Sequence, residues 1–134
     1  MSGFHEYVQS LDFNDIPESA QLLVKNSLLD TLSIIATSKG NNTNTTVRKF
    51  VSEHYPKGQH EARIVFDGRA VSPLGVAWAG GFAADSLDGH EGHFLSKGHA
   101  GATVVPGLLA LVDAYRDQGR TAYNRDYGGH YGGV

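Results

Sequence analysis

The stretch from Ser72 to Asp88 reads S-P-L-G-V-A-W-A-G-G-F-A-A-D-S-L-D. Its Ser-Pro opening is typical of a helix start, because serine caps the first turn and proline fits the first helical position. The helix that follows would carry three glycines among its alanines, which lowers its intrinsic helix propensity. Close packing against another helix or a ligand is the usual compensation. We therefore expect this helix to lie tightly against a neighbour.

The next stretch, Asp85 to Pro106, is the densest in titratable groups, with two aspartates, a glutamate, three histidines and a lysine. Glycines punctuate it, which indicates a loop between two helices. The second of these helices is predicted over 101–115 and is apolar nearly all round, with Pro106 near its start. A helix of this kind is either central or covered by a partner subunit.

Upstream, the pattern predicts a short amphipathic helix over 4–11 and a long one that starts with Pro17 at its first helical position and runs to about Ser38. Apolar residues at three- and four-residue steps, widened by further leucines, predict burial of the long helix on more than one side, with Gly40 as its C′ residue. A third helix, capped by Thr or Asn, is expected over about 44–55. Short β-branched runs around Asp67-Gly68 predict a hairpin. The fold class is therefore mainly α, with one short β-hairpin near 62–71.

Composition excludes several classes of function. The chain has 134 residues, a formal net charge of −3 and no cysteine. Nucleic acid is an unexpected partner for a chain without a basic surface, and disulfides and thiolate metal sites are excluded. The N-terminus shows no secretory signal, and the longest apolar run is too short for a membrane span. These features predict a cytoplasmic protein without a membrane partner.

Three interpretations of the charged loop remain open from the residues alone. Asp88 and His99 lie at its two ends and could exchange protons with one substrate, with Lys97 beside them to attract a carboxylate. Alternatively, Asp88, His90, His93 and His99 offer oxygen and nitrogen ligands for a metal ion. The loop could also be a solvated segment whose histidines have no chemical role.

Three segments together resemble the MmgE/PrpD family. L-L-D-T-L-S-I-I-A (28–36) resembles its first long helix, and the run from Ser72 to Asp88 resembles its Gly/Ala-rich helix. K-G-H-A-G-A-T-V-V-P-G-L-L-A-L (97–111) resembles its histidine motif. The family includes 2-methylcitrate dehydratase, cis-aconitate decarboxylase and iminodisuccinate epimerase. The resemblance implies the N-terminal portion of an all-helical domain and proton transfer next to a carboxylate, without metal or organic cofactor.

By position, the resemblance implies that Asp88 and His99 are the catalytic pair. Lys97, His90 and His93 belong to a variant part of the loop, and we expect them to be weaker substrate contacts. The loop departs from the D-x-D-D-T cluster that many members carry, because the sequence here is D-G-H-E-G. Ala100 also replaces the proline that follows the family's histidine. The substrate class implied is a small di- or tricarboxylate, and a full-length member would be a homodimer.

The resemblance covers only the N-terminal part of these longer proteins. We interpret residues 1–116 as a partial helical domain and the Gly/Tyr-rich residues 117–134 as a disordered tail, which indicates a truncated or frame-shifted coding sequence or a fragment. The expected function is that of a lyase-type (dehydratase or decarboxylase) or epimerase fragment, whose isolated chain lacks part of its site. The alternative is a non-catalytic or metal-binding helical module from a truncated gene.

Overall fold

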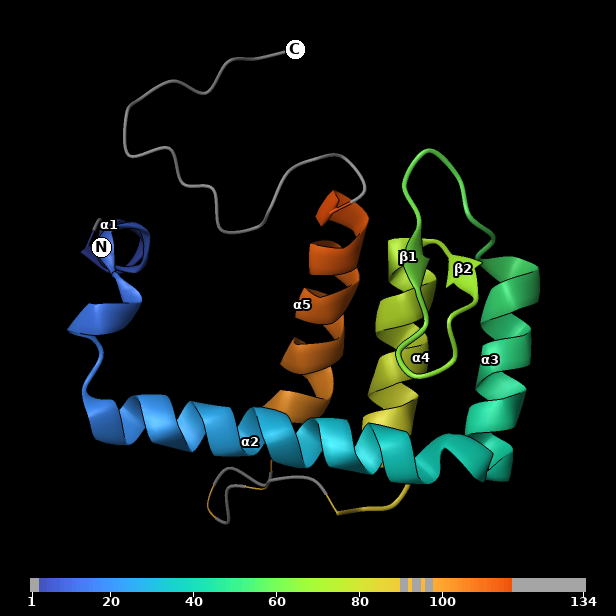
Figure 1. Cartoon of the computed structure of the whole chain (residues 1–134), viewed down its shortest axis with the longest axis horizontal. Helices are drawn as coiled ribbons and strands as arrows, with labels where there is room; N and C mark the ends of the chain where they lie inside the picture. Colours follow the sequence, from blue (N-terminus) through green and yellow to red (C-terminus); the bar gives the residue numbers. More distant parts are fainter. Residues whose placement is uncertain (1–2, 90–91, 93–94, 96–97, 117–134) are drawn as a thin grey trace.

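The structure is a computed structural model that describes residues 3–89, 92, 95 and 98–116. It is mainly helical, with one small sheet, as the sequence predicts. The α-helices are α1 (Gly3–Ser10), α2 (Glu18–Thr37), α3 (Asn42–His54), α4 (Pro73–Asp85) and α5 (Ala100–Arg116). The shorter elements are the 3-10 helices η1 (Phe13–Asp15) and η2 (Ser38–Gly40) and the strands β1 (Ala62–Arg63) and β2 (Ala70–Val71). In Figure 1, α3, α4 and α5 rise side by side from α2, and α1 lies at the far end of α2.

Helix α4 packs closely against α5, as its glycines predict. Ser72 caps α4 by accepting a hydrogen bond from the Gly75 N–H, and Pro73 occupies the first helical position. Further along, a Cβ added to Gly80 would lie 2.7 Å from the Cβ of Pro106 in α5. Such a separation is shorter than two carbon atoms allow, so only glycine fits here. The α4–α5 contact therefore depends on this pair of residues.

The hairpin rests on the helical layer. Strands β1 and β2 are antiparallel, with Ala62 opposite Val71, and Gly68 in the turn has a φ of 88°. Glycine adopts that left-handed conformation without strain. Ala62 and Val71 belong to a buried cluster with residues of α3, α4 and α5. A ribbon this short needs such a cover to be stable, so the hairpin is part of the main core.

An ion pair joins the hairpin to α5. The backbone N–H of Arg63 donates to Asp113 Oδ2 over 2.8 Å, and the Arg63 side chain binds both oxygens of the same carboxylate. These hydrogen bonds, led by the one from the Arg63 side chain, lower the pKa of the Asp113 carboxyl below its ordinary value of 3.8. A similar hydrogen bond from Arg69 lowers the pKa of Asp67 within the turn.

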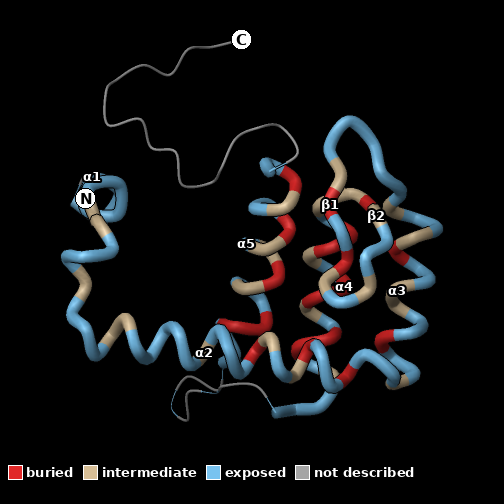
Figure 2. The backbone as a smooth tube through the Cα atoms, viewed as in Figure 1, coloured by how far each residue is buried: buried red, intermediate tan, exposed pale blue. Residues whose placement is uncertain are grey.

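The prediction that α2 is buried on more than one side is wrong. Within α2, only Thr31 and Ile35 are buried, whereas Leu22, Leu23 and Leu29 are exposed. Figure 2 shows that the buried positions lie in the C-terminal half, where the other helices meet α2. The apolar pattern is present in the sequence, but α3, α4 and α5 are too few to cover the whole helix.

Two helix boundaries differ slightly from the sequence prediction. Pro17 occupies the N-cap position of α2 rather than the first helical position, so the helix begins at Glu18. Gly40 is not a left-handed C′ residue, because α2 continues into the 3-10 helix η2 through Ser38 and Lys39. The buried Ser38 hydroxyl donates to the Ala83 carbonyl oxygen over 2.9 Å. The tighter turn is thereby fixed against α4.

Helix α3 has the cap that the sequence predicts, two residues earlier than expected. The side chain of Asn41 accepts a hydrogen bond from the Asn44 N–H over 2.8 Å. Val51 is fully buried, and Phe50 packs edge to face against Trp78 of α4. No helix in the described ranges is long and apolar enough to cross a membrane. The predicted disordered tail, 117–134, lies outside the described residues.

Candidate active site

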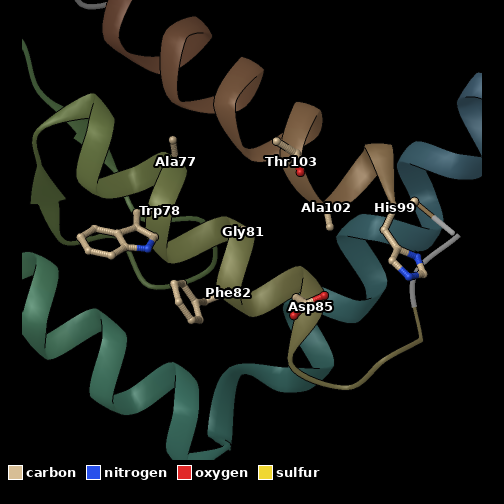
Figure 3. Close-up of a pocket in the computed structure, with 9 residues that line it drawn as sticks. Ala77, Trp78, Gly81, Phe82, Asp85, His99, Ala102 and Thr103 are labelled. Carbon is tan, nitrogen blue, oxygen red and sulfur yellow. The ribbon is translucent and has the colours of Figure 1, made fainter. Parts of the chain in front are cut away.

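An open pocket of about 570 Å³ lies where the C-terminal half of α4 meets the first turn of α5. We call it the α4–α5 pocket (Figure 3). Its lining residues are Ala77, Trp78, Gly81, Phe82, Asp85, Gly98, His99, Ala102 and Thr103. Its volume is within the range of about 300–1,000 Å³ that is usual for small-molecule sites.

His99 is the sequence-predicted catalytic residue that this pocket contains. It directly precedes α5, whose first residue is Ala100, and its side chain is exposed. A Cβ added to Gly92 would lie 2.9 Å from His99 Cε1 and 3.2 Å from Nδ1. The imidazole therefore packs directly on the backbone of the loop, and Gly92 leaves the room that this position of the ring requires.

The N-terminal end of α5 also makes the pocket favourable for an anion. Gly98, His99, Ala102 and Thr103 contribute the pocket wall at the N-terminal end of this helix. The first N–H groups of a helix have no partner within the helix, and the helix dipole makes this end positive. A carboxylate group would be favoured here, next to the imidazole of His99.

Asp85 also lines the pocket, although no sequence pattern had marked it as a functional residue. It is the last residue of α4 and lies one turn after Phe82 and two turns after Trp78. Residues at spacings of three, four and seven lie on one helix face. The spacing 78, 82 and 85 was therefore a readable signal for this face of α4. What the sequence does not reveal is that this face borders a pocket.

Asp88, the other predicted catalytic residue, lies in the turn after α4 and does not line the pocket. It is exposed, has a φ of 49°, and donates its N–H to the Asp85 carbonyl oxygen over 3.1 Å. A Cβ on the following Gly89 would lie 2.8 Å from Ile34 Cδ1, so the turn packs closely on α2. The described structure thus brings His99 and Asp85 to one pocket and leaves Asp88 beside it.

The predicted substrate contacts His90, His93 and Lys97 lie outside the described residues. The metal interpretation depended on two of these histidines. Among the described residues, no three acidic or histidine side chains cluster to hold a metal ion. Because His90 and His93 lie outside the described residues, a role for them as metal ligands or substrate contacts stays a prediction.

Comparison with known proteins agrees with this architecture. The family profile of the MmgE/PrpD N-terminal domain matches residues 2–124. The chain belongs to the MmgE/PrpD family. The match includes the long helix α2, the Gly/Ala-rich helix α4 and the histidine motif at the start of α5, and it extends eight residues beyond position 116. MmgE/PrpD membership is consistent with a dehydratase- or lyase-type or epimerase role. A comparison with curated proteins finds no significant match.

Proposed function

We propose that this MmgE/PrpD domain provides one wall of the active site of a lyase or epimerase for small polycarboxylates. The reaction moves a proton at the carbon next to a carboxylate. In a dehydration, a base takes that proton, an acid protonates the leaving hydroxyl, and the products are an alkene and water. In an epimerisation, the proton returns to the opposite face of the same carbon. In a decarboxylation, carbon dioxide leaves and the carbon gains a proton.

The position of His99 is the observation that carries the proposal. The residue borders an open pocket next to the positive end of α5. A substrate carboxylate at that helix end would hold the adjacent carbon near the imidazole, which in its neutral form accepts a proton and then returns it. The two requirements of the chemistry, a carboxylate site and a proton acceptor, meet at one helix start.

We propose Asp88 as the second acid–base group, because it matches the family's aspartate by position. It follows α4 at the start of the loop that leads to His99. Asp85 is the alternative, because it lines the pocket and is three residues away. Lys97, His90 and His93 are proposed as contacts to the outer carboxylates of the substrate.

Exchange of substrate hydrogen for deuterium, or conversion of the substrate, tests the proposal for each reaction type. The full-length gene product is incubated with small di- and tricarboxylates in heavy water, and proton NMR follows exchange or conversion at the carbon next to each carboxylate. We expect at least one of these acids to react in an enzyme-dependent manner. Absence of any reaction across the series would overturn the proposal.

The same assay separates the two aspartates. We expect Asp88→Asn to lower the rate by about a hundredfold or more, which is the usual size of an acid–base contribution. Asp85→Asn should keep most of the rate while preserving the helical circular dichroism signal. If the two results are reversed, Asp85 is the acid–base group and the assignment to Asp88 is wrong.

A further inference from the structure

The two ends of the α4–α5 pocket differ in chemistry. Asp85 and His99 lie at one end, and Trp78 and Phe82 of α4 lie at the other (Figure 3). Between them the wall consists of small residues. A compact acid, charged at every end, would use only the first half of this pocket.

The aromatic end is fixed in position and still open. Trp78 packs edge to face against Phe50 (ring centroids 5.3 Å apart) and against Tyr55 (5.2 Å), and Phe82 lies 6.2 Å away on the next turn. Despite these contacts, 38% of Trp78 and 41% of Phe82 remain exposed. Aromatic surface held in one orientation at a pocket wall is typical of sites that bind an apolar group.

Neighbouring glycines of α4 explain why there is room beside these rings. At Gly80 the space is filled by Pro106, but a Cβ at Gly81 would meet only the Ala102 carbonyl oxygen, at an ordinary 3.5 Å. The two helices are therefore in direct contact at Gly80, whereas at Gly81, which lines the pocket, an added Cβ fits without displacing α5. A side chain at position 81 would extend into the pocket without pushing the helices apart at Pro106.

We propose that the aromatic end is a subsite for an apolar substituent. The ligand is then a small carboxylate that carries an alkyl or aromatic group, with its carboxylate at the start of α5 and its apolar group against Trp78 and Phe82. The identity of the charged end rests on the proposed function, whereas the aromatic subsite rests on the pocket lining alone.

Trp78 is the sole tryptophan of the chain, so its fluorescence reports occupation of the subsite directly. The 134-residue chain is titrated with succinate and with 2-phenylsuccinate, which differ only in the apolar group. We expect 2-phenylsuccinate to change the fluorescence saturably and to bind at least about tenfold more tightly, because the ring removes apolar surface from water. Equal affinities for the two acids would overturn the subsite.

Two variants guard against a misleading result. Gly81→Leu should fill the pocket and weaken 2-phenylsuccinate at least about tenfold, with little effect on succinate. If that variant does not fold, Phe82→Ala, a change at a part-exposed position, should reduce the difference between the two acids. The control is His5→Ala, an exposed residue of α1 that does not line the pocket. If neither Gly81→Leu nor Phe82→Ala changes the affinity for 2-phenylsuccinate relative to succinate, the proposal is contradicted.

The outcome also separates this inference from the proposed function. Tight binding of 2-phenylsuccinate without exchange on any polycarboxylate supports the subsite and contradicts the lyase or epimerase reading. If compact acids exchange hydrogen for deuterium but 2-phenylsuccinate binds no more tightly than succinate, the proposed function is supported and the aromatic subsite is contradicted. A fluorescence signal that follows protein concentration, and not ligand, would show that another protein copy covers the rings and would overturn the subsite.

Discussion

At Gly80 and Pro106 the proline ring of α5 packs directly on the backbone of α4. A Cβ at position 80 would lie 2.7 Å from the Pro106 Cβ and 3.3 Å from its Cγ. The proline ring is rigid and lies inside a helix, so it cannot move aside as a long flexible side chain could. This contact sets the approach of the two helices that form the α4–α5 pocket.

We therefore expect Gly80→Ala to destabilise the chain by about 1–3 kcal/mol, because forcing apart a packed contact outweighs the better helix propensity of alanine. Urea unfolding followed by circular dichroism measures the change. The matched control is Gly107→Ala in α5, where a Cβ would meet nothing within 4 Å. That variant should gain about 0.5–1 kcal/mol. Equal effects at both positions would contradict the role given to the contact.

Removing the carboxylate that joins α5 to the hairpin should weaken the fold at neutral pH. Asp113 accepts hydrogen bonds from the backbone and side chain of Arg63, which is about half exposed and therefore partly screened by solvent. We expect Asp113→Asn to lower the free energy of unfolding by about 1 kcal/mol. The exposed Asp30→Asn is the control and should have little effect.

The effect of Asp113→Asn should also depend on pH in a defined direction. Folding lowers the pKa of Asp113 below 3.8, so the carboxylate contributes stability above that value. The contribution is lost as the pH falls through the lower pKa of the folded state. Unfolding of both proteins in urea, measured at neutral pH and at about pH 2, should show the difference between them decreasing in acid. If the difference in free energy of unfolding between the two proteins is the same at both pH values, the ion pair is not the source of that difference.

Ser72 should contribute measurably as the cap of α4. Its hydroxyl oxygen accepts a hydrogen bond from the Gly75 N–H over 3.2 Å. We expect Ser72→Ala to cost about 1 kcal/mol of stability, measured by urea unfolding, and Ser72→Asp to restore most of it. If the alanine variant is as stable as the parent, Pro73 and tertiary packing alone determine the helix start.

Local features of this chain could be predicted from its sequence, whereas features that depend on contacts between distant residues could not. The start of α4 was predicted because Ser72 and Pro73 act on their own turn. Close packing of α4 was predicted from its glycines, but the partner Pro106 lies 26 positions beyond Gly80 and could not be identified. The apolar stripe of α2 gave a wrong burial prediction, because a stripe does not reveal how many helices cover it. His99 was identified by resemblance, whereas the pocket position of Asp85 depends on how two helices cross.

Gly92 should control the position of the His99 ring. Any side chain at position 92 would meet the imidazole at 2.9 Å, so Gly92→Ala requires the ring to shift. We expect this variant to lower the exchange rate of the full-length protein about tenfold or more, because small displacements of an acid–base group are costly. Its thermal stability should be unchanged. Gly58→Ala, with nothing within 4 Å of the added Cβ, should keep the parent rate. Equal rates for the two variants would contradict this role of Gly92.

The most direct test of the proposed chemistry is the rate of His99→Ala. The variant and the full-length parent are compared by proton NMR in heavy water on the polycarboxylate that reacts best, with His5→Ala as the surface histidine control. The proposal predicts a loss of about a hundredfold or more for His99→Ala, with circular dichroism and thermal unfolding unchanged, and the parent rate for His5→Ala. Parent-like exchange by a folded His99→Ala protein would contradict it.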